Sequence, residues 1–305
     1  MRDIFIGVDG GGTKTQILIE DGLGFELASA ISGPGNIRSV AGAWNSVNEG
    51  IENALRKAGI DLHDPHYRFH AGLGLAGTEV KESYEAFLKV PHPFHTLVLD
   101  SDAYAACLGV HANKSGAIVI IGTGVIGFQI DRQKRSRVGG WGFPYADEGG
   151  GAWLGMEALR IAFKGLDARC EKTPLIEAIL KKFQATEAHP ESLVSFANQA
   201  KPGDFGSIAP LVLTYLDKRD PHAEDLLTRA AKEIECVIAA LEKKRDLTER
   251  QYGVPLPLCL LGGIAKFLIS FLSPEIQARL VPRQHDAAKG AIFMVKAHLK
   301  TQEGI

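Results

Sequence analysis

Residues 3–20, DIFIGVDGGGTKTQILIE, place three consecutive glycines between two β-rich runs. The runs Asp3–Asp9 and Thr15–Glu20 predict two strands, and Phe25–Ala30 predicts a third after the Asp21-Gly22 turn. Glycine tolerates the positive φ angles that tight hairpin turns require, so the three strands are expected to form a meander. This meander opens the fold.

A second opening of the same kind follows in the middle of the chain. Ala117–Ile121 and Ile126–Ile130 predict two strands around a Gly-Thr-Gly turn, so the chain repeats its own beginning. The other predicted elements are a helix ending at Gly59, strands Phe69–Leu75 and Thr96–Leu99, a helix Ser101–Val110, a mostly helical region from Gly149 through Leu247, a strand Leu256–Leu261 and a last helix Ala287–Leu299. The order predicts an α/β protein.

The 305 residues are about twice the ~150 of a typical domain, which allows two lobes or one large α/β unit, and the repeated opening favours two lobes. The predicted N-terminal lobe covers residues 1–113, which the last helix, 287–303, could join. The predicted C-terminal lobe covers residues 114–286 and carries a helical insertion. No low-complexity linker separates the halves, so a shared hinge and cleft are expected rather than a flexible tether.

Composition excludes several classes of protein. Apolar residues make up 45%, charged residues 23%, and the mean hydropathy is -0.00, which fits neither a disordered chain nor a membrane protein. With 34 Lys and Arg against 36 Asp and Glu the net charge is -2, so neither nucleic acid nor an anionic membrane surface is an expected partner. Four scattered cysteines and a short apolar start predict a protein of the reducing cytoplasm.

The first glycine turn is a candidate phosphate site. Side-chain-free residues let backbone N–H groups point at an anion, and a threonine hydroxyl adds a donor. The residues concerned are Gly10, Gly11, Gly12, Thr13 and Lys14. Asp9, at the end of the strand, can hold a hydrated divalent cation. An ordinary hairpin rarely needs three glycines, and a P-loop is excluded because Thr13 precedes the lysine and a strand follows.

The second turn, Gly122, Thr123 and Gly124, offers the same anion chemistry. If the two turns face each other, they could hold the β- and γ-phosphates of one nucleotide. G-x-G-x-x-G also occurs here and at Gly72–Gly77, but the second copy runs into a strand, and no acid follows the first at the expected distance of about 20 residues. A dinucleotide fold is therefore disfavoured.

Paired carboxylates are the candidate catalytic and sugar-binding groups. Asp100-Ser101-Asp102 lies at a strand end, where Ser101 or Asp100 could serve only as a helix cap, while a second carboxylate could take a proton from a sugar hydroxyl. Asp147 and Glu148 lie among glycines and aromatic residues; they could bind sugar hydroxyls or merely favour the next helix N-terminus. Asn36 by itself reads as a helix cap.

These motifs together resemble the BadF/BadG/BcrA/BcrD ATPases and, within them, the glucosamine and N-acetylglucosamine kinases. The matching stretches are DGGGTKT at Asp9–Thr15, GPGN at Gly33–Asn36, GLGLAG at Gly72–Gly77, DSDAYAA at Asp100–Ala106, IGTG at Ile121–Gly124, GGWG with DEGGG at Gly139–Gly151 and LLGGIAKF at Leu260–Phe267. The resemblance implies an actin-like fold of two duplicated ribonuclease-H-like lobes, with ATP in the cleft and Mg²⁺.

The resemblance also implies roles for individual residues. Asp102 matches the catalytic base for the sugar 6-hydroxyl, and Asp9 lies near Mg²⁺, which it would contact through water. The two glycine turns match the phosphate loops, and the adenosine motif corresponds to Gly262, Gly263 and Lys266. The implied sugar-binding set is Asn36, Gly77, Asp147 and Glu148. We also expect a homodimer.

Departures from the family pattern bear on the substrate. Animal-type N-acetylglucosamine kinases carry GTGSN where this chain has Gly122–Ile126, GTGVI, and they carry glycine and serine where Ala146 and Gly150 stand. Free glucosamine therefore competes with N-acetylglucosamine as the predicted substrate. The alternative function is an ATP-driven activator of a 2-hydroxyacyl-CoA dehydratase-like redox partner, which would need cluster-binding cysteines. A non-catalytic sugar sensor is a third possibility.

Overall fold

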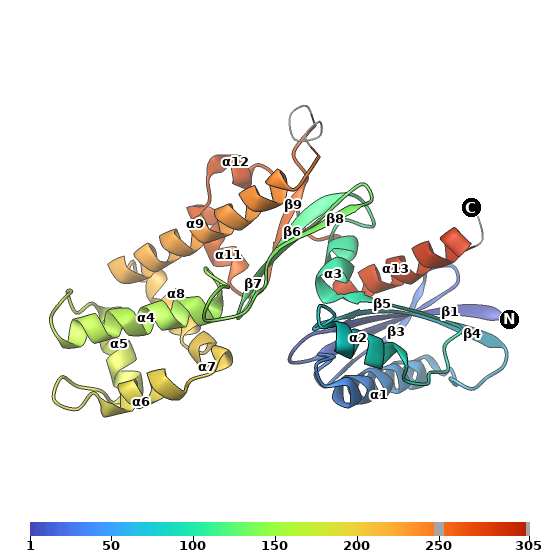
Figure 1. The fold of residues 1–305 in the computed structure, drawn as a ribbon, viewed down its shortest axis with the longest axis horizontal. Coiled ribbons are helices and arrows are strands. Elements are labelled where there is room, and N and C mark those ends of the chain that lie inside the picture. The colour runs from blue at the N-terminus through green and yellow to red at the C-terminus, as the bar shows by residue number, and fades with distance from the viewer. Residues whose placement is uncertain (247–252, 303–305) are drawn as a thin grey trace. The chain divides into compact units, whose positions relative to one another are not determined.

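The computed structural model describes residues 1–246 and 253–302 (Figure 1). The chain forms two compact units, Met1–Gly116 with Pro282–Ile305 and Ala117–Val281. Residues 114–116 and 282–286, which the sequence assigned to the second lobe, belong to the first unit. The predicted end of the helical region at Leu247 lies outside the described residues.

The first unit is built on a five-stranded sheet of order β3-β2-β1-β4-β5. Its strands are β1 (Arg2–Gly10), β2 (Thr15–Asp21), β3 (Glu26–Ser32), β4 (Tyr67–Leu75) and β5 (Thr96–Ser101). The first three pair antiparallel, which confirms the predicted meander, while β1, β4 and β5 run parallel. The carboxyl ends of three parallel strands therefore lie at one edge of the sheet.

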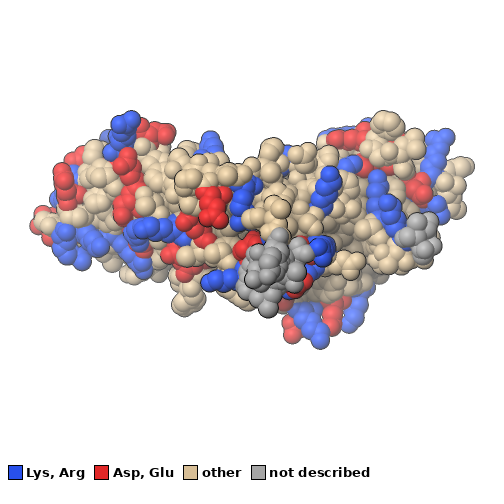
Figure 2. Space-filling model, turned by 90° about the horizontal axis from the view of Figure 1, so that it is seen from above, with Lys and Arg blue, Asp and Glu red and all other residues tan. Residues whose placement is uncertain are grey.

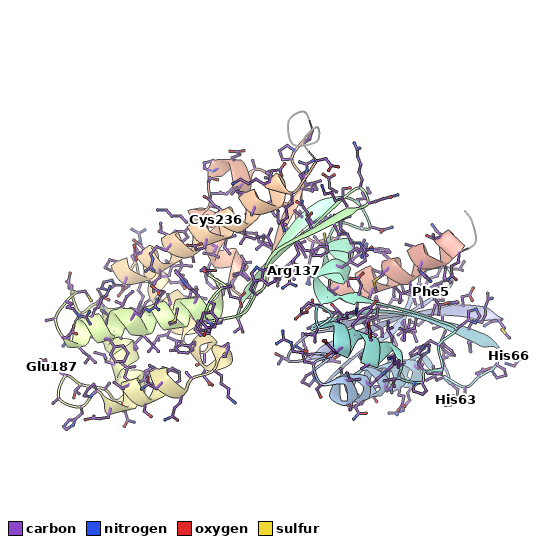
Figure 3. The ribbon with its side chains drawn as sticks, in the orientation of Figure 1. Phe5, His63, His66, Arg137, Glu187 and Cys236 are labelled. Atoms are coloured by element: carbon purple, nitrogen blue, oxygen red, sulfur yellow. The ribbon has the colours of Figure 1, made fainter. Side chains whose placement is uncertain are left out.

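Side chains of β1 and β2 alternate between two cores because strand residues point to opposite faces in turn. Ile4, Ile6 and Val8 pack toward helix α1 (Val40–Ala58), whose buried residues include Trp44, Val47, Ile51 and Leu55. Phe5 and Leu18 lie on the other face, against α13 (Ala287–Gln302) (Figure 3). Helix α1 ends at Gly59, as predicted, with a φ of 69°.

Helix α13 packs unusually close to the sheet and to α3 (Asp102–Val110) because small residues meet at each contact. A Cβ on Gly72 of β4 would collide with the carbonyl oxygen of Ala291, and one on Gly7 of β1 with that of Ala288. Gly290 of α13 has no room for a Cβ beside the carbonyl oxygen of Ala105. The remaining helix of this unit is α2 (Lys81–Leu88).

We expect Gly72→Ala to destabilise the protein by about 3 kcal/mol, because the new methyl group would push α13 off the sheet. Urea unfolding gives the free energy of unfolding. Gly22→Ala is the matched control, since its Cβ would lie 3.6 Å from the nearest atom, an ordinary contact. Equal stabilities of the two variants would contradict the packing described here.

The second unit is built on a four-stranded sheet of order β8-β7-β6-β9. Its strands are β6 (Gly116–Ile121), β7 (Val125–Asp131), β8 (Lys134–Gly139) and β9 (Leu258–Leu261). Strand β6 lies between β7 and a parallel β9, just as β1 lies between β2 and a parallel β4. The predicted repeat of the chain's opening is confirmed.

The described residues of the second unit also form a series of helices. They are α4 (Gly151–Leu166), α5 (Pro174–Phe183), α6 (Glu191–Gln199), α7 (Pro202–Gly206), α8 (Ala209–Leu216), α9 (Pro221–Lys243), α11 (Ala265–Leu268), the 3₁₀ helix η1 (Ile269–Phe271) and α12 (Pro274–Gln277). The predicted apolar stripe of α9, from Ala223 through Leu241, is buried except for Val237, which is half-buried. One core joins this stripe to α4 and to strand β6.

Among the described residues, no helix is long and apolar enough to cross a membrane. Figure 2 shows Lys and Arg side chains interspersed with Asp and Glu on the visible face of the coloured residues. Side chains of both signs thus occur on this face, as the near-neutral composition would suggest.

Candidate active site

The first glycine turn joins β1 to β2 at the edge where the parallel strands end. The N–H of Gly11 donates to the carbonyl of Lys14 over 3.0 Å and closes the turn. Gly12, Thr13 and Lys14 are exposed. No described residue accepts a hydrogen bond from the backbone N–H groups of Gly12 and Thr13. These donors suit an anion, as the sequence predicted.

Two further loops pack directly on this turn. The N–H of Gly35 donates to the carbonyl of Gly11 (2.9 Å), and the N–H of Ala76 donates to that of Gly10 (2.8 Å). A Cβ on Gly35 would lie 2.6 Å from both Gly10 Cα and Thr15 Oγ1, so the backbones could not approach this closely with a larger residue. The glycines of GPGN therefore serve packing.

Asn36 and Gly77, two predicted sugar-binding residues, lie together beside these loops. A Cβ on Gly77, whose φ is 90°, would lie 2.6 Å from Asn36 Oδ1. The interpretation of Asn36 as a helix cap is wrong, because α1 is capped at Ser39 and Asn36 Oδ1 instead accepts from the N–H of Arg38 (3.0 Å). The side-chain oxygen of Asn36 therefore stabilises the loop that contains Asn36.

The β5–α3 junction places the two aspartates differently. Ser101 is the cap of α3, since its hydroxyl accepts from the N–H of Tyr104 at 3.2 Å. Asp100 Oδ1 accepts from the N–H of Ser101 (2.7 Å), while Asp102, the first residue of α3, accepts from that of Ala103 (2.8 Å). Asp102 is half-buried and is not needed as the cap, so its carboxylate can serve chemistry.

Asp9 is the electrostatic centre of the first unit's site. Burial, together with the nearby carboxylates of Asp102 and Asp286, raises its pKa to about 7, although the charge of Lys14 acts in the opposite direction. The structure thus brings Asp9, Asp102 and Asp286 within electrostatic range of one another. Gln16 Nε2 donates to Asp286 Oδ2 over 2.6 Å and fixes that carboxylate.

These carboxylates fit Mg²⁺ in a particular way. Hard oxygen ligands suit Mg²⁺, and mutual repulsion among the three carboxylates would be relieved by a cation. In the described part of the chain, no group of three or more His, Cys, Asp or Glu side chains could enclose a metal. The donor set therefore fits an ion that keeps most of its water, with Asp9 as the near carboxylate.

We expect Asp9→Asn to stabilise the ligand-free protein at pH 8 by about 2 kcal/mol. The folded protein binds the Asp9 proton more tightly than the unfolded chain, so the cost of ionisation grows as the pH rises from 3.8 through about 7. The gain should therefore shrink toward pH 4, as urea unfolding across this range would show. Glu52→Gln, an exposed change on α1, is the control; a destabilised Asp9→Asn at pH 8 would contradict the expectation.

In the second unit, the β6–β7 turn is braced by the start of α4. The N–H of Gly122 donates to the carbonyl of Gly124 (3.0 Å). The carbonyls of Gly122 and Thr123 accept from the N–H groups of Gly151 (2.8 Å) and Ala152 (2.9 Å). A Cβ on Gly150 would lie 2.8 Å from the Thr123 carbonyl oxygen, which explains why glycines follow the acidic pair. The turn is thus held rigidly.

Asp147 lies directly against this turn. Burial raises the pKa of its carboxyl and Glu148 raises it further, while hydrogen bonds from the N–H groups of Val125 and Gly142 and the charge of Arg137 lower it. Its φ is 70°, a strained value for a residue with a side chain, and Oδ1 is buried with no partner among the described residues. Neither acid caps α4 by a side-chain hydrogen bond, because its N-cap is Gly150.

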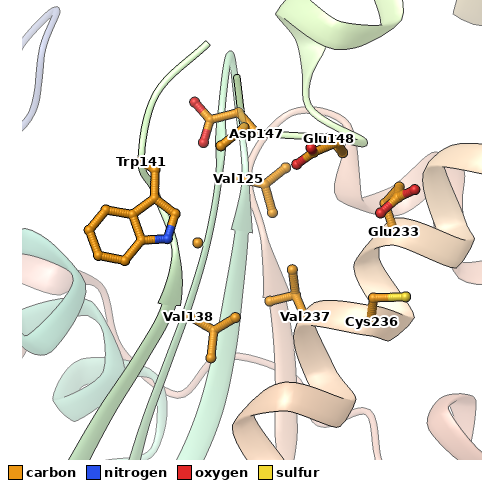
Figure 4. A pocket seen from close by; sticks show the side chains of 10 residues that line it. Val125, Val138, Trp141, Asp147, Glu148, Glu233, Cys236 and Val237 are labelled. Carbon is orange, nitrogen blue, oxygen red and sulfur yellow. The ribbon is translucent and has the colours of Figure 1, made fainter. Parts of the chain in front are cut away.

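Glu148 belongs to a pocket of about 260 Å³ on the α9 side of Asp147 (Figure 4). The pocket is lined by Val125, Val138, Gly139, Trp141, Ala146, Asp147, Glu148, Glu233, Cys236 and Val237. Trp141 is 80% exposed, and the Arg137 guanidinium lies 5.2 Å from its ring centroid. Arg137 also donates to the carbonyls of Gly139 (3.2 Å) and Gly140 (2.5 Å), which fixes this stack.

The predicted adenosine motif follows β9, next to the end of β6. Gly262 has a φ of 96°, and a Cβ there would collide with the Ile121 carbonyl. A Cβ on Gly263 would meet no atom within 4 Å, so this position is open. Lys266 Nζ lies 4.8 Å from the Phe267 ring centroid. The motif thus adjoins the second glycine turn.

Sequence reasoning missed three residues of these sites: Asp286, Glu233 and Cys236. Asp286 accepts from the N–H of Lys289 (2.9 Å) at the start of α13, a capping pattern that the sequence DAAK could have indicated. Glu233 and Cys236 come from α9, far along the chain, and only the fold brings them to the Asp147 loop.

The sequence model of one family, described as the BadF/BadG/BcrA/BcrD ATPase family, matches residues 6–295. The chain belongs to this ATPase family. Within the curated proteins, this BadF/BadG/BcrA/BcrD ATPase is 36% identical over 290 residues to the Vibrio cholerae protein named glucosamine kinase GspK, with 95% of this chain and 94% of that protein covered. It is 30% identical over 278 residues to the Dictyostelium discoideum N-acetyl-D-glucosamine kinase, covering 86% and 85%.

Solved structures of similar proteins have the same fold. A Chromobacterium violaceum protein named as a candidate N-acetylglucosamine kinase superposes with a TM-score of 0.84 at 33% identity, covering 96% of this BadF/BadG/BcrA/BcrD ATPase and 98% of that chain. A Streptomyces griseus ROK family glucokinase shares the fold, with a TM-score of 0.53 at 16% identity over 96% and 98% of the chains. The predicted actin-like α/β fold of two lobes is confirmed.

Proposed function

We propose that the protein is an amino-sugar kinase that transfers the γ-phosphoryl group of ATP to the 6-hydroxyl of glucosamine or N-acetylglucosamine. Its family and its curated relatives make it an enzyme of the sugar-kinase class. The observation that carries the proposal is the position of Asp102. It opens α3 without capping it and acts electrostatically on Asp9, beside a turn with unused backbone donors.

In the proposed mechanism, Asp102 accepts the proton of the sugar hydroxyl as its oxygen attacks phosphorus. The N–H groups of the two turns, with Thr13, Lys14 and Thr123, hold the phosphates and stabilise the charge that develops on them. Gly262, Gly263 and Lys266 border the adenosine. Asp9 would hold a hydrated Mg²⁺ ion, which would supply charge neutralisation for the phosphates of ATP. Positioning and charge stabilisation account for most of the rate.

Sugar binding is proposed for Asn36, Gly77, Asp147 and Glu148. The unpartnered Oδ1 of Asp147 supports this role, because a buried carboxylate oxygen needs a donor and a sugar hydroxyl provides one. The side chain of Asn36 contributes an amide, and Gly77 leaves room beside it. The homodimer and the cytoplasmic location remain predictions.

A coupled assay of ADP release with glucosamine, N-acetylglucosamine or glucose tests the proposal. We expect ADP formation to depend on an amino sugar, and product analysis to find the phosphate on the 6-oxygen. ADP formation that ignores every sugar would instead indicate an ATPase. Anaerobic incubation with iron and sulfide then tests the activator alternative, since only an activator should acquire a cluster; uptake of one would overturn the kinase proposal.

A further inference from the structure

We infer that the pocket beside Asp147 binds the positively charged amine of a sugar. In this inference Glu233 of α9 is a specificity-determining residue that favours unacetylated amino sugars over N-acetylated ones. This inference rests on the proposed function and deepens it. It concerns only the second unit, whose residues line the whole pocket.

The shape of the pocket suits one sugar ring. Its volume of about 260 Å³ falls just below the ~300–1,000 Å³ of pockets for drug-sized ligands. Figure 4 shows Trp141 on one side, Glu148, Glu233 and Cys236 on the other, and Val138 and Val237 between them. An indole face packs well on the C–H groups of a sugar, and the Arg137 stack holds that face in place.

The charges of the pocket indicate which functional group a bound sugar ring should carry. Glu148 and Glu233 make no hydrogen bond or ion pair within the described residues, and no Lys or Arg lines the pocket. Arg137, whose charge acts on Asp147, is bound to two backbone carbonyls and to the Trp141 face. The carboxylates opposite Trp141 therefore lack a cation of their own in the described chain, and an ammonium group on a bound ligand would balance their charge.

A second observation points independently to a ligand. Asp147 Oδ1 is buried without a partner, although the N–H groups of Val125 and Gly142 bind the same carboxylate. A hydroxyl group of a bound ligand would supply the missing donor. We assign Oδ1 to a sugar hydroxyl and Glu233, with Glu148, to the 2-ammonium group.

Glucosamine supplies what the pocket lacks. A sugar amine resembles an α-amino group, whose pKa is about 7.7–8.0, so it is largely protonated at pH 7. An acetamide is neutral, offers a single N–H and would leave the remaining carboxylate oxygens unpaired, which counts against binding. The valines would pack equally well against sugar C–H groups or an acetyl methyl group. The carboxylates are therefore the groups that distinguish glucosamine from N-acetylglucosamine.

The test compares kcat/KM of the full-length protein for glucosamine, N-acetylglucosamine and glucose at pH 7. Glu233→Gln keeps the shape of the side chain and removes its charge. We expect it to lower kcat/KM for glucosamine about tenfold, through KM, and to change the other two sugars less than about twofold. Glu224→Gln, an exposed change at the start of the same helix, is the control and should alter none of them.

Three outcomes would overturn the inference. Equal losses for all sugars would show a structural role for Glu233, and unchanged kinetics would show no role. A wild-type enzyme with a higher kcat/KM for N-acetylglucosamine than for glucosamine would also overturn the inference, and no variant is needed to find this. The proposed function survives each of these. If the wild type phosphorylates no sugar at all, the proposed function fails and this inference fails with it.

Discussion

An Asp102→Asn protein is expected to bind sugar but to lose about a thousandfold in kcat, because general-base catalysis contributes about 10²–10⁴ to rates. An amide keeps the hydrogen bond to the N–H of Ala103 and so preserves the start of α3. It cannot accept a proton from the sugar hydroxyl. Steady-state kinetics gives kcat, and calorimetry gives the sugar affinity.

Asp100→Asn is the matched control for this prediction, since it changes a neighbouring carboxylate two residues away. Asp100 Oδ1 accepts from the N–H of Ser101, and an asparagine can keep that bond. We expect the control to lose far less than Asp102→Asn. Near-normal turnover of Asp102→Asn would assign the proton to a different group, and a loss of sugar binding would assign Asp102 to affinity rather than to catalysis.

The second large effect is expected at Gly124. Gly124→Ala should lower kcat/KM about a hundredfold, because displacing a substrate-binding group by about 1 Å can cost that much. An alanine Cβ there would overlap Asp147 Oδ2 and lie 2.7 Å from its Cγ. Asp147 would have to leave the turn and give up its hydrogen bond from the N–H of Val125. Both the phosphate turn and the sugar loop would shift.

The neighbouring glycine supplies the comparison. A Cβ on Gly122 meets no atom within 4 Å, so Gly122→Ala adds the same methyl group to the same turn without displacing Asp147. It should reduce kcat/KM much less than Gly124→Ala does. Thermal unfolding separates misfolding from misplacement, because Gly124→Ala should keep a cooperative transition. Indistinguishable kinetics for the two variants would refute the role of the Gly124–Asp147 contact.

The parts of the fold that could be predicted have strong local signals. The meander follows from β-rich runs around glycine turns, and α1 follows from an apolar stripe that ends in a left-handed glycine. Strand β8 and helix α2 were not predicted. The sequence of β8, KRSRVG, is polar because none of its residues is fully buried, so it lacks the alternation that marks a strand.

The residues of the candidate sites that could be predicted also have strong local signals. Single motifs in contiguous sequence, such as the glycine turns and Asp100-Ser101-Asp102, could be found without a structure. The membership of Asp286 and Glu233 in these sites could not, because Asp286 precedes α13 and Glu233 lies on α9, both distant in sequence from the motifs that they join. Asn36 was misread for a related reason. Its side chain satisfies its own loop two residues on, and the helix begins only after Ser39.

The close packing of α13 on Gly7 and Gly72 sets an order of events during synthesis. A ribosome delivers the chain from the N-terminus, so the sheet of the first unit emerges early while its covering helix is translated last. While Ala117–Val281 is being translated, α13 does not yet cover the sheet face that carries Phe5 and Leu18. We expect a nascent chain with a solvent-exposed apolar surface, and a premature stop codon near the end of the gene would make that exposure permanent.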